Sequence, residues 1–223
     1  DLEALIDAGI SSFKIEGRLK DVRYIKNVVN YYRRRIDNIL ERRKDISRPS
    51  AGHTVTEFTP DPTKSFTRGA SKYMLHGKCA GVASFDTPKA VGEYLGKVKS
   101  TTRKGFTLDK ECDMSAGDGI CIITKSGMNG TNINAVEGEV IIPNRTEGIE
   151  IGAKVYRNYD HHFSLLLDRS RTRRTIDATA KLDISQHNIT LTVTDCEGIS
   201  IAISREVDLE MAGNVEKMAD TAR

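Results

Sequence analysis

Apolar and polar positions follow different periods along the chain, and the period changes near residue 90. Residues 2–10 read as the end of an amphipathic helix, and a short strand follows at Phe13 and Ile15. From Val22 to Leu40 apolar residues recur every three to four positions, which predicts a long helix with one apolar face. A strand between two helices needs the neighbouring strands of a parallel sheet. We therefore expect the end piece of an α/β (TIM-like) barrel, in a chain that is a piece of a longer protein.

The middle of the chain changes to a β pattern. Residues 45–90 place Pro49, Pro60 and Pro62 among Ser, Thr and Asp residues, which indicates a connector. Residues 91–160 contain five or six short alternating runs separated by Gly-rich turns. This pattern is typical of a small closed antiparallel β-barrel.

The last part of the chain alternates again. Within residues 161–223, three apolar-polar runs predict a three-stranded antiparallel meander, and a helix is expected from about Asp208. The fold class is therefore α+β and largely β. Its four parts are the barrel end piece at 1–44, the connector, the small β-barrel, and the meander with its helix.

Charge changes this picture because it is unevenly distributed. The net charge is only +3, yet residues 14–44 hold eleven Lys and Arg against four acidic residues. A second basic cluster follows the barrel stretch, at Arg169, Arg171, Arg173 and Arg174. Such asymmetry suggests a polyanionic partner such as RNA, although a lone basic helix is more simply explained as a solvated helix face.

Three charged residues at the expected strand are the candidate catalytic groups. Lys14 and Glu16 alternate with the apolar residues, so a regular strand directs both to one face. Arg18 follows on the loop, and its guanidinium suits a carboxylate or phosphate. Residues at the carboxyl end of a barrel strand face the active site. The alternative is a structural ion-pair network that closes the barrel end.

Several site classes find no support in the sequence. The four cysteines are irregularly spaced without a CxxC pair, so we expect reduced thiols in a cytoplasmic protein and no metal site in this chain. No G-x-S-x-G or H-E-x-x-H motif indicates a protease. No apolar run reaches about 18 residues, so we expect no membrane partner.

One motif resembles a known family. The stretch LIDAGISSFKIEGRLKD, residues 5–21, resembles a signature of the peptidase U32 family, also called collagenase-like proteases. SFTRGASKYML, residues 65–75, resembles a following segment of that family. The β-rich remainder resembles the modules of its long members, including a barrel similar to the second domain of translational GTPases.

The resemblance implies a function. Long members resemble enzymes that hydroxylate a cytidine of large-subunit ribosomal RNA, with a four-cysteine iron–sulfur cluster on the barrel domain. The cluster is therefore expected upstream, and this fragment is expected to be inactive alone. We expect it to complete the barrel and dock structured RNA through elements that flank the small β-barrel. The expected RNA-binding residues are Arg33, Arg34, Arg35, Arg68, Arg169, Arg171, Arg173 and Arg174.

Two alternatives stay open at this point. The chain could be part of a collagenase-like protease, which gelatin cleavage by the intact protein would favour. It could also be a non-catalytic assembly module, since an oligomer is possible.

Overall fold

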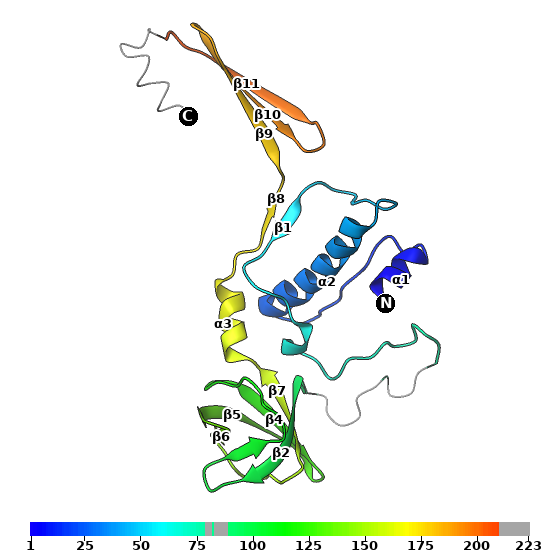
Figure 1. The fold of residues 1–223 in the computed structure, drawn as a ribbon, viewed down its shortest axis with the longest axis vertical. Helices are drawn as coiled ribbons and strands as arrows, with labels where there is room; N and C mark the ends of the chain where they lie inside the picture. The colour runs from blue at the N-terminus through cyan, green and yellow to red at the C-terminus, as the bar shows by residue number, and fades with distance from the viewer. Residues whose placement is uncertain (79–81, 83–88, 210–223) are drawn as a thin grey trace. The chain divides into compact units, whose positions relative to one another are not determined.

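The computed structural model describes residues 1–78, 82 and 89–209, which hold more strand than helix (Figure 1). The chain groups into two compact units. The first comprises Asp1–Ile46 and Thr56–Thr172, and the second comprises Ser47–Val55 and the residues from Arg173 on. The largely β fold class is confirmed. The four-part division of the sequence stays a prediction.

The strand expected near the amino terminus is not formed. Helix α1 spans Leu2–Asp7 and helix α2 spans Val22–Arg42, and residues 10–17 between them have no regular secondary structure. A strand requires backbone hydrogen bonds from a neighbouring strand, and the described part of the chain offers none here. The predicted strand at Phe13 and Ile15 is therefore wrong for this structure, and the α/β-barrel end piece is not confirmed.

Helix α2 begins where the sequence predicts. The carboxylate of Asp21 accepts a hydrogen bond from the backbone amide of Tyr24 at 2.9 Å, which caps the first turn. The helix buries Val28 and Ile39. Several apolar residues of the expected face remain exposed: Val22, Ile25, Val29 and Tyr32. These side chains leave an apolar surface on that part of the helix.

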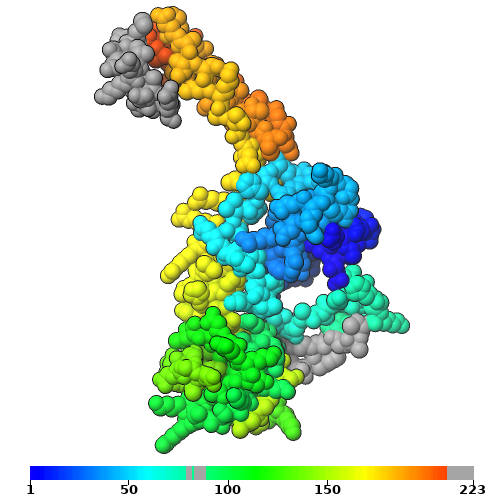
Figure 2. Space-filling view, in the orientation of Figure 1, coloured from blue at the N-terminus to red at the C-terminus, as the bar shows by residue number. Residues whose placement is uncertain are grey.

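A closed six-stranded antiparallel barrel forms the β part of the first unit, as predicted. Its strands are β2 (Glu93–Thr101), β3 (Phe106–Leu108), β4 (Gly119–Thr124), β5 (Gly127–Glu137), β6 (Val140–Pro143) and β7 (Lys154–Tyr159). They pair in the order β2-β3-β6-β5-β4-β7, and β7 closes on β2. Figure 2 shows the outer surface of this barrel, mostly in green. Its interior is packed with apolar side chains: Leu95, Val98, Phe106, Ile120, Ile122, Ile133, Ile141 and Val155.

Two short helical elements continue the first unit. Helix α3 (His161–Arg169) directly follows β7, and a 3₁₀ turn, η1 (Pro62–Lys64), lies in the connector. Phe58, Phe163 and Leu167 form a small second core. Asn27 of α2 is fully buried and exchanges hydrogen bonds of 2.6 and 2.8 Å with the backbone of Asp61. These contacts join the connector to α2 and α3.

The second unit is built from antiparallel strands. β1 (His53–Val55) pairs with β8 (Arg173–Thr175), and β9 (Ala178–Ile184), β10 (Asn188–Asp195) and β11 (Ser200–Glu206) form the predicted meander. Cross-strand register places apolar residues on one face, for example Leu182, Leu191 and Ile203 side by side. These side chains are exposed. Most of the helix expected from about Asp208 lies outside the described residues.

Candidate functional site

The three candidate catalytic residues lie on an exposed segment. The Lys14 ammonium and the Glu16 carboxylate form an ion pair at 2.8 Å, with side chains that are 83% and 57% exposed. Arg18 lies in the exposed turn that precedes α2. An exposed pair of this kind contributes little to stability. The catalytic role of these three residues stays a prediction.

The basic residues of α2 divide by their contacts. Arg33 forms an ion pair with Asp37 one turn further along the helix. Arg34 donates from Nη2 to the Thr56 hydroxyl at 2.8 Å and to the Phe58 carbonyl at 2.9 Å, so it holds the connector. These two guanidinium groups have contacts within the chain that an RNA phosphate would have to displace.

Arg35 and Arg68 each lie near an aromatic ring. Arg35 is exposed, and its guanidinium lies 5.3 Å from the ring centroid of Tyr31. The Arg68 guanidinium lies 5.1 Å from the ring centroid of Phe66. Both arrangements are cation–π contacts.

The second basic cluster divides between the two compact units. Arg169 ends α3 and Arg171 follows it, whereas Arg173 and Arg174 belong to β8. All four are exposed. Arg174 donates to the Ser50 hydroxyl at 3.0 Å and also to the carbonyl of Ala51. The cluster offers exposed charge to a polyanion, and its role in RNA binding stays a prediction.

Sequence reasoning missed a buried ionic cluster at the base of the barrel. Arg157 of β7 is 8% exposed and donates to the Glu93 carboxylate of β2 at 2.7 and 3.1 Å. Its guanidinium also lies 3.4 Å from carboxylate oxygens of Asp118 and Asp160. Lys64 of η1 donates to Asp160 at 2.7 Å. The only local signal in the sequence was Asp160 directly before α3. The cluster could not be predicted because it depends on contacts between distant segments.

The same carboxylates also organise the backbone. Asp118 accepts hydrogen bonds from the amides of Ser115 and His161, and Asp160 accepts one from the amide of Phe163 at the start of α3. Every charge in the cluster therefore has hydrogen-bonding partners, as buried charges require. The cluster joins the barrel to α3 and to η1, and it is a structural clamp.

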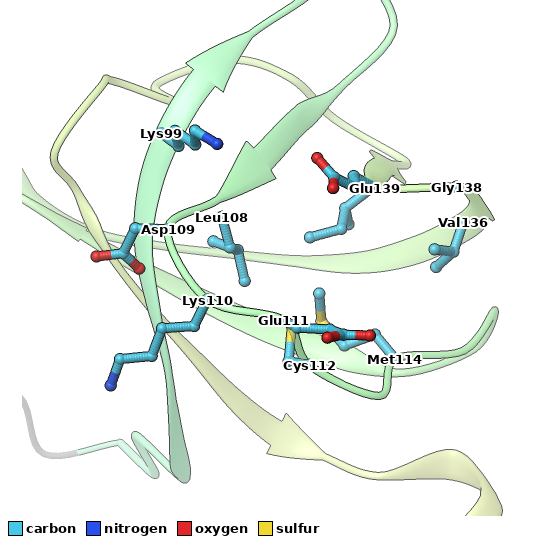
Figure 3. A pocket seen from close by; sticks show the side chains of 11 residues that line it. Lys99, Leu108, Asp109, Lys110, Glu111, Cys112, Met114, Val136, Gly138 and Glu139 are labelled. Carbon is cyan, nitrogen blue, oxygen red and sulfur yellow. The ribbon is translucent and has the colours of Figure 1, made fainter.

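A cavity of about 520 Å³ opens on the barrel wall (Figure 3). Leu108, Cys112 and Met114 face it, while Lys110 points away in the close-up. Its lining includes acidic as well as basic residues, among them Glu139. Carboxylates at the rim disfavour a phosphate group, so this cavity is a poor candidate for RNA.

The described cysteines do not form a metal-binding group. Cys112 is half-buried beside the barrel cavity, Cys121 is buried on β4, and Cys196 is exposed at the turn between β10 and β11. Cys79 lies outside the described residues. Within residues 1–78, 82 and 89–209, no group of three or more His, Cys, Asp or Glu could hold a metal ion. That the iron–sulfur cluster lies outside this chain stays a prediction.

A second groove combines basic and aromatic side chains. It has a volume of about 400 Å³ and is lined by residues from the start of α2, η1, the end of β7 and α3. Phe66 and Tyr159 line it and are each 37% exposed. The Lys20 ammonium lies 3.1 Å from the ring centroid of Phe66. Arg23 of α2 donates to Asp168 of α3 at 2.7 and 2.8 Å.

This groove is the candidate site of the described structure. Sequence reasoning named Arg68, but it did not connect the segment around Phe66 with Lys20 or Tyr159. Tyr159 is remote in sequence from Phe66, so no local pattern could have shown their proximity.

None of the helices in the described ranges is long and apolar enough to cross a membrane.

Comparison with known proteins gives two findings. The family model of peptidase family U32 matches residues 1–81. The chain is also 33% identical over 226 residues to the 23S rRNA 5-hydroxycytidine C2501 synthase of Escherichia coli (strain K12). That alignment covers 97% of this chain and 35% of the relative, so the chain spans about a third of the relative's length. No solved structure matches significantly.

Proposed function

The chain belongs to peptidase family U32, and we propose that it is part of an RNA-modifying member that hydroxylates a cytidine of large-subunit ribosomal RNA. The observation that supports this proposal is the extent of the similarity to the Escherichia coli synthase. The family model ends at residue 81, whereas the similarity to the synthase extends over 97% of the chain. The barrel and the meander are therefore shared with an rRNA-modifying protein.

Within that protein, we assign this chain to RNA docking. The groove at Phe66 and Lys20 places a cation beside exposed aromatic rings, which is the combination that binds unpaired nucleotides. The exposed cluster from Arg169 to Arg174 supplies sequence-independent attraction to phosphates. The substrate is structured rRNA, and the protein acts in the cytoplasm, where ribosomes are modified.

The hydroxylation chemistry is assigned to the rest of the protein. An iron–sulfur cluster on an upstream domain would supply electron transfer. Lys14, Glu16 and Arg18 are proposed to meet that domain, because their segment is exposed here and lacks strand neighbours.

The test is nucleoside analysis by mass spectrometry. Deleting the gene in the encoding organism should remove 5-hydroxycytidine from its large-subunit rRNA, and a plasmid copy of the intact protein should restore it. Unchanged 5-hydroxycytidine in the deletion strain would overturn the proposal. The family description also favours a peptidase, so the intact protein should be assayed for gelatin cleavage in parallel.

A further inference from the structure

The Phe66 side chain lies in an unusual environment for a surface aromatic residue. It is 37% exposed, it lines the groove of about 400 Å³, and two cations lie near its ring. The Lys20 ammonium is 3.1 Å from the ring centroid and the Arg68 guanidinium is 5.1 Å from it. The negatively polarised ring face that attracts a cation is also the surface on which a nucleobase stacks.

Lys20 differs from the other basic residues of the groove in its partners. Arg23 is bound by Asp168 at 2.7 Å, and Lys64 is bound by Asp160 at 2.7 Å. Among the described residues, no carboxylate forms an ion pair with Lys20, and its ammonium rests on the Phe66 ring. The Lys20 charge can therefore turn to a phosphate without breaking an ion pair.

The backbone before Lys20 is held in a conformation that side chains rarely adopt. Leu19 has a φ of +59° and its side chain is fully exposed. The Lys20 amide donates to the Gly17 carbonyl at 3.1 Å, which closes the turn. Left-handed backbone at a residue other than glycine is unfavourable, and such strain is found most often at functional sites. Here the strained turn places Lys20 over the groove.

We propose that this groove binds a single unpaired nucleotide of RNA, with its base on Phe66 and Tyr159 and its phosphate on Lys20. The base would replace the Lys20 ammonium on the Phe66 ring, and the ammonium would move to the phosphate. Paired bases are stacked within a duplex and cannot reach a ring in this way, so the site selects single-stranded loops or ends. This inference rests on the proposed function, because it takes RNA as the substrate class.

The test measures binding of the full chain to a short fluorescein-labelled single-stranded RNA and to the matching duplex, by fluorescence anisotropy. Phe66→Leu removes the ring and keeps apolar bulk, and it should weaken single-strand binding roughly 5- to 100-fold. Phe66→Trp keeps a stacking surface and should retain binding. Lys20→Gln should weaken binding and lower the salt dependence.

The matched control is Tyr94→Leu. Tyr94 is a 42% exposed aromatic residue of the barrel with the Lys110 ammonium 5.0 Å from its ring centroid, but it does not line the groove. This variant should bind single-stranded RNA as tightly as the unaltered chain. Circular dichroism of each variant checks that the fold is retained.

Three results would overturn the inference. They are the absence of single-strand binding by the unaltered chain at low salt, equal binding by the Phe66→Leu chain, and an equal loss in the Tyr94→Leu control. These outcomes are separable from failure of the proposed function. If the gene deletion leaves 5-hydroxycytidine unchanged while Phe66-dependent binding is observed, the nucleotide site stands and the hydroxylation proposal fails.

Discussion

Arg157 and Glu93 face each other across the seam where the barrel closes, and the guanidinium donates two hydrogen bonds, of 2.7 and 3.1 Å, to the carboxylate. They form a cross-strand pair of β7 and β2, the last and first strands of the barrel. Arg157 also reaches Asp118 and Asp160, so the closing pair is continuous with the clamp that holds α3.

Removing the buried guanidinium should therefore destabilise the barrel strongly. Arg157→Met would leave the carboxylates of Asp118 and Asp160 buried without their shared cation. Breaking a buried ion pair in this way costs about 3 to 5 kcal/mol. We expect this decrease in the free energy of unfolding of barrel segments, measured by hydrogen exchange across a urea series.

A control for this substitution is Lys154→Met. Lys154 is an exposed residue of the same strand, and removing one exposed charge should change barrel stability little. If Arg157→Met and Lys154→Met had equal effects, the clamp would not contribute to stability.

The clamp should also make stability depend on pH through Asp160. Burial alone raises the pKa of Asp160, but the hydrogen bonds from Lys64 and the Phe163 amide and the charge of Arg157 outweigh it and lower the pKa below its usual value. A carboxyl whose pKa is lower in the folded state contributes stability above its unfolded pKa of about 3.9. This contribution should be lost as pH falls from about 4 through the folded pKa.

The measurement is the urea midpoint of the chain as a function of pH, for the unaltered protein and for Asp160→Asn. The amide oxygen of Asn can still accept the hydrogen bond from Phe163, so α3 keeps its cap. Asp160→Asn should be less stable at neutral pH, and its midpoint should fall less on acidification. Parallel pH curves for the two proteins would refute the role of Asp160.

The cysteines should differ in their reactivity. Burial is the main cause that raises the pKa of the Cys112 and Cys121 thiols, whereas Cys196 is exposed on a turn. Because the thiolate is the reactive form, iodoacetamide at neutral pH should label Cys196 first and Cys121 last among the three described cysteines. Peptide mass spectrometry over time gives the order of labelling. Rapid labelling of Cys121 in the folded chain would contradict its burial in the barrel.

The β elements could be predicted because their signals are local. Alternating residues and Gly-rich turns were sufficient for the barrel, and the three apolar-polar runs within residues 161–223 were sufficient for the meander. The strand at Phe13 failed because a strand depends on neighbours that the local pattern does not specify. The sequence shows apolar alternation at Phe13 and Ile15, but it does not show a strand with which this segment could pair.

Site residues were harder to predict because their roles depend on distant contacts. Arg34 looks like any other basic helix residue in the sequence, but it binds Thr56 and Phe58. Nothing in the local sequence marks Arg157 as a member of an ionic cluster, and its partners follow from barrel closure onto β2 and from the carboxylates at α3. The charge pattern alone could not separate basic residues that hold the fold together from those that are exposed to a partner such as RNA.

Docking of rRNA by this chain can be measured by fluorescence anisotropy of a labelled large-subunit rRNA fragment over about 50 to 200 mM salt. We expect tight binding at low salt with a steep salt slope. Joint replacement of Arg169, Arg171, Arg173 and Arg174 by Ala should lower that slope by about 0.7 to 0.9 for each phosphate that the chain no longer neutralises. Replacing four barrel residues, Lys97, Lys99, Arg103 and Lys104, by Ala should leave the slope nearly unchanged. No binding at low salt, or equally weakened binding in the two variants, would contradict rRNA docking by this chain.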